Sequence, residues 1–177
     1  MIYMSRPLVQ GRACGECTAC CISLRIDETE LKKSADVKCS FLSVNGGCSI
    51  YEDRPSVCRT WYCGWRKFPE VDESMRPDKC GLMIKHYERN SVSLMLIKGK
   101  SNRILWDKRT MNMICKLREI GLSISTSVPT RTGFCYALTN IDKHMTNDLI
   151  MKSPAQATEM MKKIYFQASH SNTDPEK

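Results

Sequence analysis

Long apolar runs are missing from this sequence of 177 residues. The longest, around residues 93 to 97, has the length of a strand, whereas a membrane-crossing helix needs about 18 or more apolar residues. The N-terminal segment has no apolar stretch of signal-peptide length, because Arg6 and Arg12 interrupt it. Since nothing in this segment directs export, we expect a cytoplasmic protein that does not associate with membranes.

Familiar catalytic motifs are missing as well. The sequence contains no glycine-rich phosphate loop, no HExxH motif and no nucleophile elbow. Its three histidines, His86, His144 and His170, stand apart from one another and lack the spacing of metal ligands. The pattern therefore indicates no catalytic residue, and whether the protein is an enzyme stays open.

Acidic residues are the scarcer charged type, with 19 Asp and Glu against 27 Lys and Arg, which gives a formal net charge of +8. A basic balance favours partners that carry phosphate or acidic groups. However, the basic residues occur in scattered pairs such as Lys32-Lys33 and Lys108-Arg109. Two divalent ions held by eight thiolates would also halve the formal charge. A solvated surface is therefore favoured over a nucleic-acid footprint.

Cysteine, in contrast, is abundant: the chain has 11, and nine of them precede Gly81. A reducing cytoplasm disfavours structural disulfides, and an odd number leaves at least one thiol unpaired. Thiolates bind soft metal ions strongly, and a cysteine pair separated by two residues can bend its backbone around one ion. We therefore expect eight cysteines to bind metal: Cys14, Cys17, Cys20, Cys21, Cys39, Cys48, Cys58 and Cys63.

Two of these cysteines, Cys20 and Cys21, are adjacent in the sequence. Neighbouring side chains diverge by about 100° on a helix and about 180° on a strand, so the pair is poorly placed to hold one ion together. Four ligands per tetrahedral ion and eight cysteines then predict two thiolate-ligated centres, or one centre and spare thiols. The spacing does not indicate how the eight divide.

The order of these cysteines resembles that of a known family. Cys14-x-x-Cys17-x-x-Cys20-Cys21 is followed by Cys39, by a segment from Gly47 to Arg59 and by Cys63; the segment reads Gly-Cys-Ser-Ile-Tyr-Glu-Asp-Arg-Pro-Ser-Val-Cys-Arg. Residues 14 to 65 are in this respect similar to the YkgJ-like CxxCxxCC cysteine-cluster proteins, described as zinc- or iron-chelating domains. Cys80, Cys115 and Cys135 lie outside the pattern.

This resemblance implies a bacterial, cytoplasmic protein that chelates zinc or iron, with an iron–sulfur cluster in some relatives. It implies no agreed reaction. Two alternatives remain open: an iron–sulfur redox or accessory protein that acts with a protein-modifying enzyme, and, less favoured, a basic zinc module that binds nucleic acid. Arg54 and Arg59 flank Cys58 and could donate hydrogen bonds to thiolates, or could simply be exposed at a helix end.

The hydrophobic pattern predicts an α+β protein. In the first half we expect a turn and helix over residues 14 to 21 and a brief helix from residue 29 to 32. In the second half we expect a hairpin of strands 82–87 and 92–98, a helix from Asp107 or Thr110 to Ile120, strands 122–128 and 133–138, and a helix from Pro154.

We thus expect one unit over residues 1–177. A cysteine-rich half of loops and short helices, pinned by metal, covers residues 14–80, because it is poor in aliphatic periodicity. A small antiparallel sheet with packed helices covers residues 81–168 and supports it. Residues 169–177 are expected to form a flexible tail.

Overall fold

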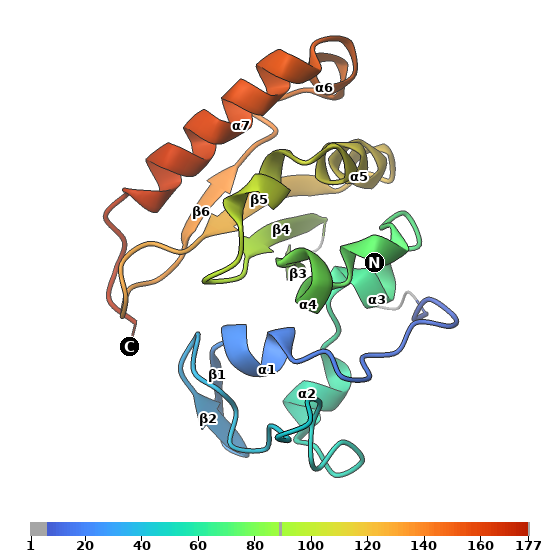
Figure 1. Ribbon diagram of the computed structural model, residues 1–177, viewed down its shortest axis with the longest axis vertical. Helices are drawn as coiled ribbons and strands as arrows, with labels where there is room; N and C mark the ends of the chain where they lie inside the picture. Colours follow the sequence, from blue (N-terminus) through green and yellow to red (C-terminus); the bar gives the residue numbers. More distant parts are fainter. Residues whose placement is uncertain (1–6, 89, 177) are drawn as a thin grey trace.

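The computed structural model describes residues 7–88 and 90–176, and it confirms an α+β protein with two sheets. Figure 1 shows a four-stranded sheet with helices α5 and α7 on one side and a smaller lobe on the other. We call residues 12 to 63 the cysteine lobe. Within the described part of the chain, no helix is long and apolar enough to cross a membrane.

The four-stranded sheet has the order β3-β4-β5-β6, with bounds Leu82–Glu88, Ser91–Leu96, Ser123–Val128 and Ala137–Asn140. The β3 and β4 strands form the predicted antiparallel hairpin, and β5 and β6 are also antiparallel. The prediction of an antiparallel sheet is wrong for β4 and β5, which run parallel. Residues between them include η2 (Asn102–Trp106) and α5 (Lys108–Glu119), and such a helical crossover returns the chain to the starting end of the sheet.

The two predicted helices of the second half are confirmed. Helix α5 is capped by the Asp107 side chain, whose Oδ1 accepts a hydrogen bond from the Arg109 amide at 2.9 Å. It ends before Gly121, whose φ of 84° suits a helix stop. Helix α7 (Pro154–Ser169) follows the short α6 (Asn147–Lys152) and begins with the expected proline in its first turn.

Alternate residues of the hairpin serve two cores. One face contributes to the larger core beneath α5 and α7, which includes Leu82, Ile84, Leu94, Leu96, Ile114, Leu117, Met161 and Ile164. The opposite face presents Met83, Met95 and Ile97, which pack with Ala19 of the cysteine lobe in a smaller core. The period of two residues along a strand therefore places helices on one face and the cysteine lobe on the other.

The cysteine lobe contains little regular structure. It includes α1 (Ala19–Ser23), β1 (Ile26–Glu28), β2 (Leu31–Lys33) and α2 (Ser56–Thr60). The brief helix predicted for residues 29 to 32 is wrong, because Ile26 pairs with Lys33 and Glu28 with Leu31 in an antiparallel hairpin. That register buries Leu31, which a solvated helix would leave exposed.

The chain leaves the lobe through α3 (Gly64–Lys67), η1 (Glu73–Met75) and α4 (Pro77–Cys80). Trp65, Phe68, Val71 and Met75 in this connection belong to the larger core. At the other end of the chain, the Cys135 amide donates to Asp174 O at 2.9 Å, and the Glu176 amide donates to Gly133 O at 2.9 Å. The expected flexibility of residues 169–177 stays a prediction.

Candidate metal centre

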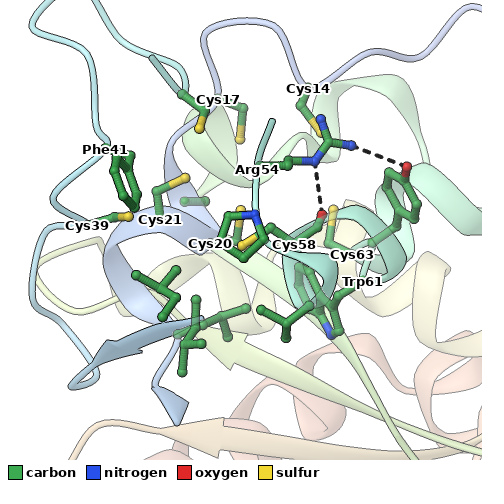
Figure 2. Close-up of a pocket in the computed structure, with 18 of the residues that line it drawn as sticks. Cys14, Cys17, Cys20, Cys21, Cys39, Phe41, Arg54, Cys58, Trp61 and Cys63 are labelled. Carbon is green, nitrogen blue, oxygen red and sulfur yellow. Dashed lines mark hydrogen bonds between the residues drawn. The ribbon is translucent and has the colours of Figure 1, made fainter. Parts of the chain in front are cut away.

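All eight predicted cysteines line one cavity of about 280 Å³. They reach it from separate segments: the turn and helix of residues 14 to 21, the loops that carry Cys39 and Cys48, helix α2 and the residue before α3. Figure 2 shows the sulfur atoms of the labelled cysteines gathered around this cavity, with Arg54 beside them. None of the 11 cysteines, all of which lie in described residues, forms a disulfide.

The sulfurs do not yet form a closed coordination shell. Across residues 7–88 and 90–176, no group of three or more Cys, His, Asp or Glu side chains is arranged so that it could hold a metal ion as it stands. The donor set suits zinc or iron, since every candidate ligand is a thiol. That a metal pins this half of the chain therefore stays a prediction.

Three of the eight thiols, Cys17, Cys20 and Cys63, pack against the smaller core on the sheet, and Cys14 is joined to Cys17 by a turn; we call these four the inner cysteines. The Cys17 amide donates to Cys14 O at 2.9 Å, which closes this turn. Cys17, Cys20 and Cys63 pack against the smaller core of Ala19, Met83, Met95 and Ile97. Three of the four inner cysteines thus pack on the sheet face opposite the large helices.

The inner cysteines are electrostatically coupled. Burial, together with the charges of Cys14 and Cys17, raises the pKa of Cys63 to about 11. Burial also raises the pKa of Cys17, although the Ala19 amide donates a hydrogen bond to its sulfur and lowers it. These thiols need a compensating cation to ionise together, as a metal ion would provide.

The remaining four, Cys21, Cys39, Cys48 and Cys58, pack against neither core within the described residues; we call them the outer cysteines. The Cys39 amide donates to Cys21 O at 2.9 Å, and Cys48 forms a β-bridge with Leu42, whose amide donates to Cys39 O at 3.1 Å. Burial raises the pKa of Cys58, and the charges of Cys21, Cys39 and Cys48 raise it further.

The two sets meet at the adjacent pair. The side chain of Cys20 hydrogen-bonds to that of Cys21; this contact raises the pKa of Cys20 and lowers that of Cys21 to about 7. After Cys21, the charges that raise the pKa of Cys20 are those of Cys17 and Cys14. The charge of Cys21, in contrast, raises the pKa of Cys58. Neighbouring residues of one short helix therefore face different thiols, while their own sulfurs stay in contact.

Basic side chains surround the outer cysteines. The Lys33 ammonium donates to Ile22 O at 2.9 Å, and to Leu24 O at 2.5 Å, and its charge lowers the pKa of Cys21. Arg54 stacks on Tyr51 at 3.9 Å and donates to Cys58 O at 3.2 Å. The hydrogen bonds of Arg54 reach backbone and Tyr62 oxygens (Figure 2), so they do not support the first of the two alternatives for this arginine, donation to a thiolate.

Sequence reasoning missed several residues that line the cavity. Met83 and Lys85 reach it from β3, at alternate positions of one strand face. Burial lowers the pKa of the Lys85 ammonium. Glu30 caps α2 by accepting hydrogen bonds from the Ser56 amide at 2.7 Å and hydroxyl at 3.1 Å. The alternation of the 82–87 strand could have indicated Met83 and Lys85, but only with the packing of the lobe known.

Comparisons with known proteins found no match. No protein-family model matches this chain, and neither a curated protein nor a solved structure is similar to it. The arguments for a function therefore rest on the residues themselves and on the motif in residues 14 to 65.

Proposed function

We propose that this protein binds two metal ions, zinc or iron, through eight cysteine thiolates. The observation that carries the proposal is the convergence of all eight patterned cysteines on one cavity. Thiols from distant segments that line one cavity form a soft ligand set, and a bound cation would offset the burial and the mutual charges that raise their pKa. The resemblance of residues 14 to 65 to the YkgJ-like proteins supports the same chemistry.

We assign one ion to the inner cysteines and one to the outer cysteines. The contacts within each set support this division: Cys17, Cys20 and Cys63 share one packing surface, and Cys21, Cys39 and Cys48 are linked through backbone hydrogen bonds and one bridge. Each centre would have four thiolate ligands, the number that closed zinc sites use. Because Cys20 and Cys21 are adjacent in the chain, the two ions would be close neighbours.

The charge around the cavity supports the same assignment. Two tetrathiolate sites with divalent ions carry two negative charges each, and buried negative charge is stabilised by nearby cations. Lys33 and Arg54 lie beside the outer cysteines, and Arg76 lowers the pKa of Cys17 among the inner ones. Arg76 is held in place by Asp78, with Nε to Oδ1 at 2.8 Å and Nη2 to Oδ2 at 2.9 Å.

Elemental analysis with an absorption spectrum, on protein prepared without oxygen, tests the proposal. We expect two metal ions per chain. A colourless protein would hold zinc, whereas brown protein with visible absorption would hold an iron–sulfur cluster and favour the redox or accessory alternative. Protein that contains neither metal, and takes up neither on reconstitution, would contradict the proposal.

The division between the two sets is tested by replacing the adjacent cysteines one at a time. We expect Cys20→Ser to lose the inner ion and Cys21→Ser to lose the outer ion. Cys135→Ser, which removes an exposed thiol outside the cavity, should retain both ions. If Cys20→Ser and Cys21→Ser lose the same ion, as judged by which remaining cysteines resist alkylation, the division is wrong.

A further inference from the structure

We propose that the outer cysteines form an exchangeable metal site, from which a soft divalent cation can be delivered, whereas the inner cysteines hold their ion permanently. This inference rests on the proposed function and adds a role for one of its two centres. The ion at the outer centre would be cargo. The ion at the inner centre would be part of the fold.

The inner and outer cysteines differ in whether they pack against the buried cores. Cys17, Cys20 and Cys63 pack against the smaller core, and Cys63 also packs against the larger one. No outer cysteine packs against either core within the described residues. Release of the inner ion would therefore disturb buried contacts with the sheet, and release of the outer ion would not.

The segment that carries most outer ligands contains few buried residues. From residue 34 to residue 60, only Gly47 is buried. Val44, at the tip of the 43–48 turn, is fully exposed, and Val37 and Tyr51 are large side chains that also face solvent. Segments with few buried contacts open locally at a small free-energy cost, even where the rest of the protein stays folded.

The turn that precedes Cys48 is the part of this segment that can move. The segment is anchored at its start, where the Tyr136 hydroxyl donates to the Asp36 carboxylate at 2.8 Å and the Cys39 amide donates to Cys21 O. Beyond Cys39, the turn that precedes Cys48 is closed by local hydrogen bonds, such as those from the Ser43 amide to Gly47 O and from the Gly46 amide to Ser43 O. Cys48 is therefore the ligand that can leave first.

A close backbone contact holds this turn shut. A Cβ atom at Gly47 would lie 3.2 Å from Gly15 O, and one at Gly46 would lie 3.3 Å from Glu16 O, so the turn sits against the 14–17 turn with no side chain between. Both glycines have positive φ, of 87° and 76° for Gly46 and Gly47. Alanine at Gly47 would be strained in this conformation and would loosen the contact.

Exchange at the outer centre is then a ligand substitution without a redox step. The bond between the ion and Cys48 Sγ breaks as the turn opens, and a bond to the donor atom of an incoming thiol forms. The proton released by that thiol passes through water to the Cys48 thiolate. Repetition at the other outer cysteines transfers the ion with no change in its oxidation state.

The test follows zinc release from the full chain, reconstituted with zinc, into an excess of the chromogenic chelator 4-(2-pyridylazo)resorcinol. Zinc content is measured before the chelator is added. We expect two ions per chain and two phases of equal amplitude, the faster by at least about tenfold because local opening is cheaper than opening of a core-packed segment. Fewer than two ions would contradict the proposed function, and the inference with it; two ions that leave in one phase would overturn the inference alone.

Two variants assign the phases. Cys48→Ser should bind one ion and release it only in the slow phase, and Gly47→Ala should accelerate the fast phase without changing the slow one. Gly99→Ala is the matched control, because Gly99 has a φ of 78° but no atom within 4 Å of its Cβ position; it should leave both rates unchanged. A fast phase that survives in Cys48→Ser would show that the exchangeable ion is not bound by the outer cysteines.

Discussion

The cysteine lobe and the sheet with its helices are built on different physical principles. The sheet side buries a large set of aliphatic and methionine side chains between β3 to β5 and helices α5 and α7. The lobe buries few residues of its own and instead gathers polarisable thiols around a cavity. One half is therefore stabilised by the removal of apolar surface from water, whereas under the proposed function the other would depend on the metal ions that its thiols bind.

The smaller core is where these two principles meet. Ala19, between Cys17 and Cys20 in the chain, packs on Met83 and Met95. Since the same side chains pack against inner cysteines and cover the sheet, metal binding at the proposed inner centre would be coupled to docking of the lobe. The outer cysteines pack against neither core, and this difference underlies their proposed roles.

Metal removal should produce the largest difference between the cysteine lobe and the sheet. We expect amide hydrogen exchange in residues 34 to 60 to accelerate by at least about tenfold when zinc is chelated, while amides of β3, β4 and β5 keep their protection. The reason is that the larger core contains no outer cysteine. Equal loss of protection in both regions would mean that the sheet also depends on metal.

Gly64→Ala should damage the junction between the regions. A Cβ atom at Gly64 would lie 2.5 Å from Ile84 Cγ2 and 2.9 Å from Phe68 Cδ2, so α3 and the neighbouring Cys63 must shift away from β3. We expect the free energy of unfolding, measured in urea, to fall by about 1–3 kcal/mol.

The double variant Gly64→Ala/Ile84→Ala provides the control for this clash. Ile84→Ala removes the Cγ2 methyl group but keeps the Cβ atom, which would still lie 2.7 Å from the new Cβ, so it should relieve part of the clash. The two substitutions should therefore be less destabilising together than the sum of their separate effects. Additive effects would show that the Ile84 Cγ2 methyl group does not contribute to the loss of stability.

Tyr136→Phe should loosen the anchor between the lobe and the sheet by a smaller amount. The Tyr136 hydroxyl donates to both oxygens of Asp36, at 2.8 and 3.0 Å, and Asp36 lies 3.9 Å from the Lys98 ammonium. Loss of a hydrogen bond to a charged group should reduce the free energy of unfolding by about 1.5 kcal/mol. Tyr165→Phe, outside this contact, should change it less; an equal change would contradict a specific role for the bond to Asp36.

A modest pH dependence of stability should originate in the sheet. Burial lowers the pKa of His86 below 6.5, the nearby charge of Lys67 lowers it further, and its buried Nε2 has no hydrogen-bond partner among the described residues. Unfolding therefore takes up a proton in the window between the folded pKa and about 6.5, so stability falls as the pH drops through it.

We expect His86→Leu to reduce this acid destabilisation in urea titrations at pH 7 and pH 5. His144→Leu, an exposed control, should keep it. A pH dependence that is the same in wild type and His86→Leu would assign the effect to other groups.

Much of the second half could be predicted from residue patterns. The alternation from Leu82 marks a hairpin, and Asp107 and Gly121 bracket α5 because capping and chain reversal are local properties. The pattern did not predict that β4 and β5 run parallel, because strand direction depends on where the crossover helix packs. Strand β6 begins at Ala137, later than Gly133, whose φ of 81° belongs to a turn.

For the candidate site, too, some features follow from the local sequence, whereas others depend on contacts between distant segments. By itself, the sequence determined which atoms can act as ligands and predicted that Cys20 and Cys21 serve different centres, since both follow from thiol chemistry and from the geometry of adjacent residues. Only the tertiary structure brings Cys63 near the charges of Cys14 and Cys17, and Cys58 near those of Cys21, Cys39 and Cys48, and the proposed division rests on this grouping. Contacts between residues so far apart in the chain depend on how the lobe packs against Met83 and Met95, and no local pattern encodes that packing.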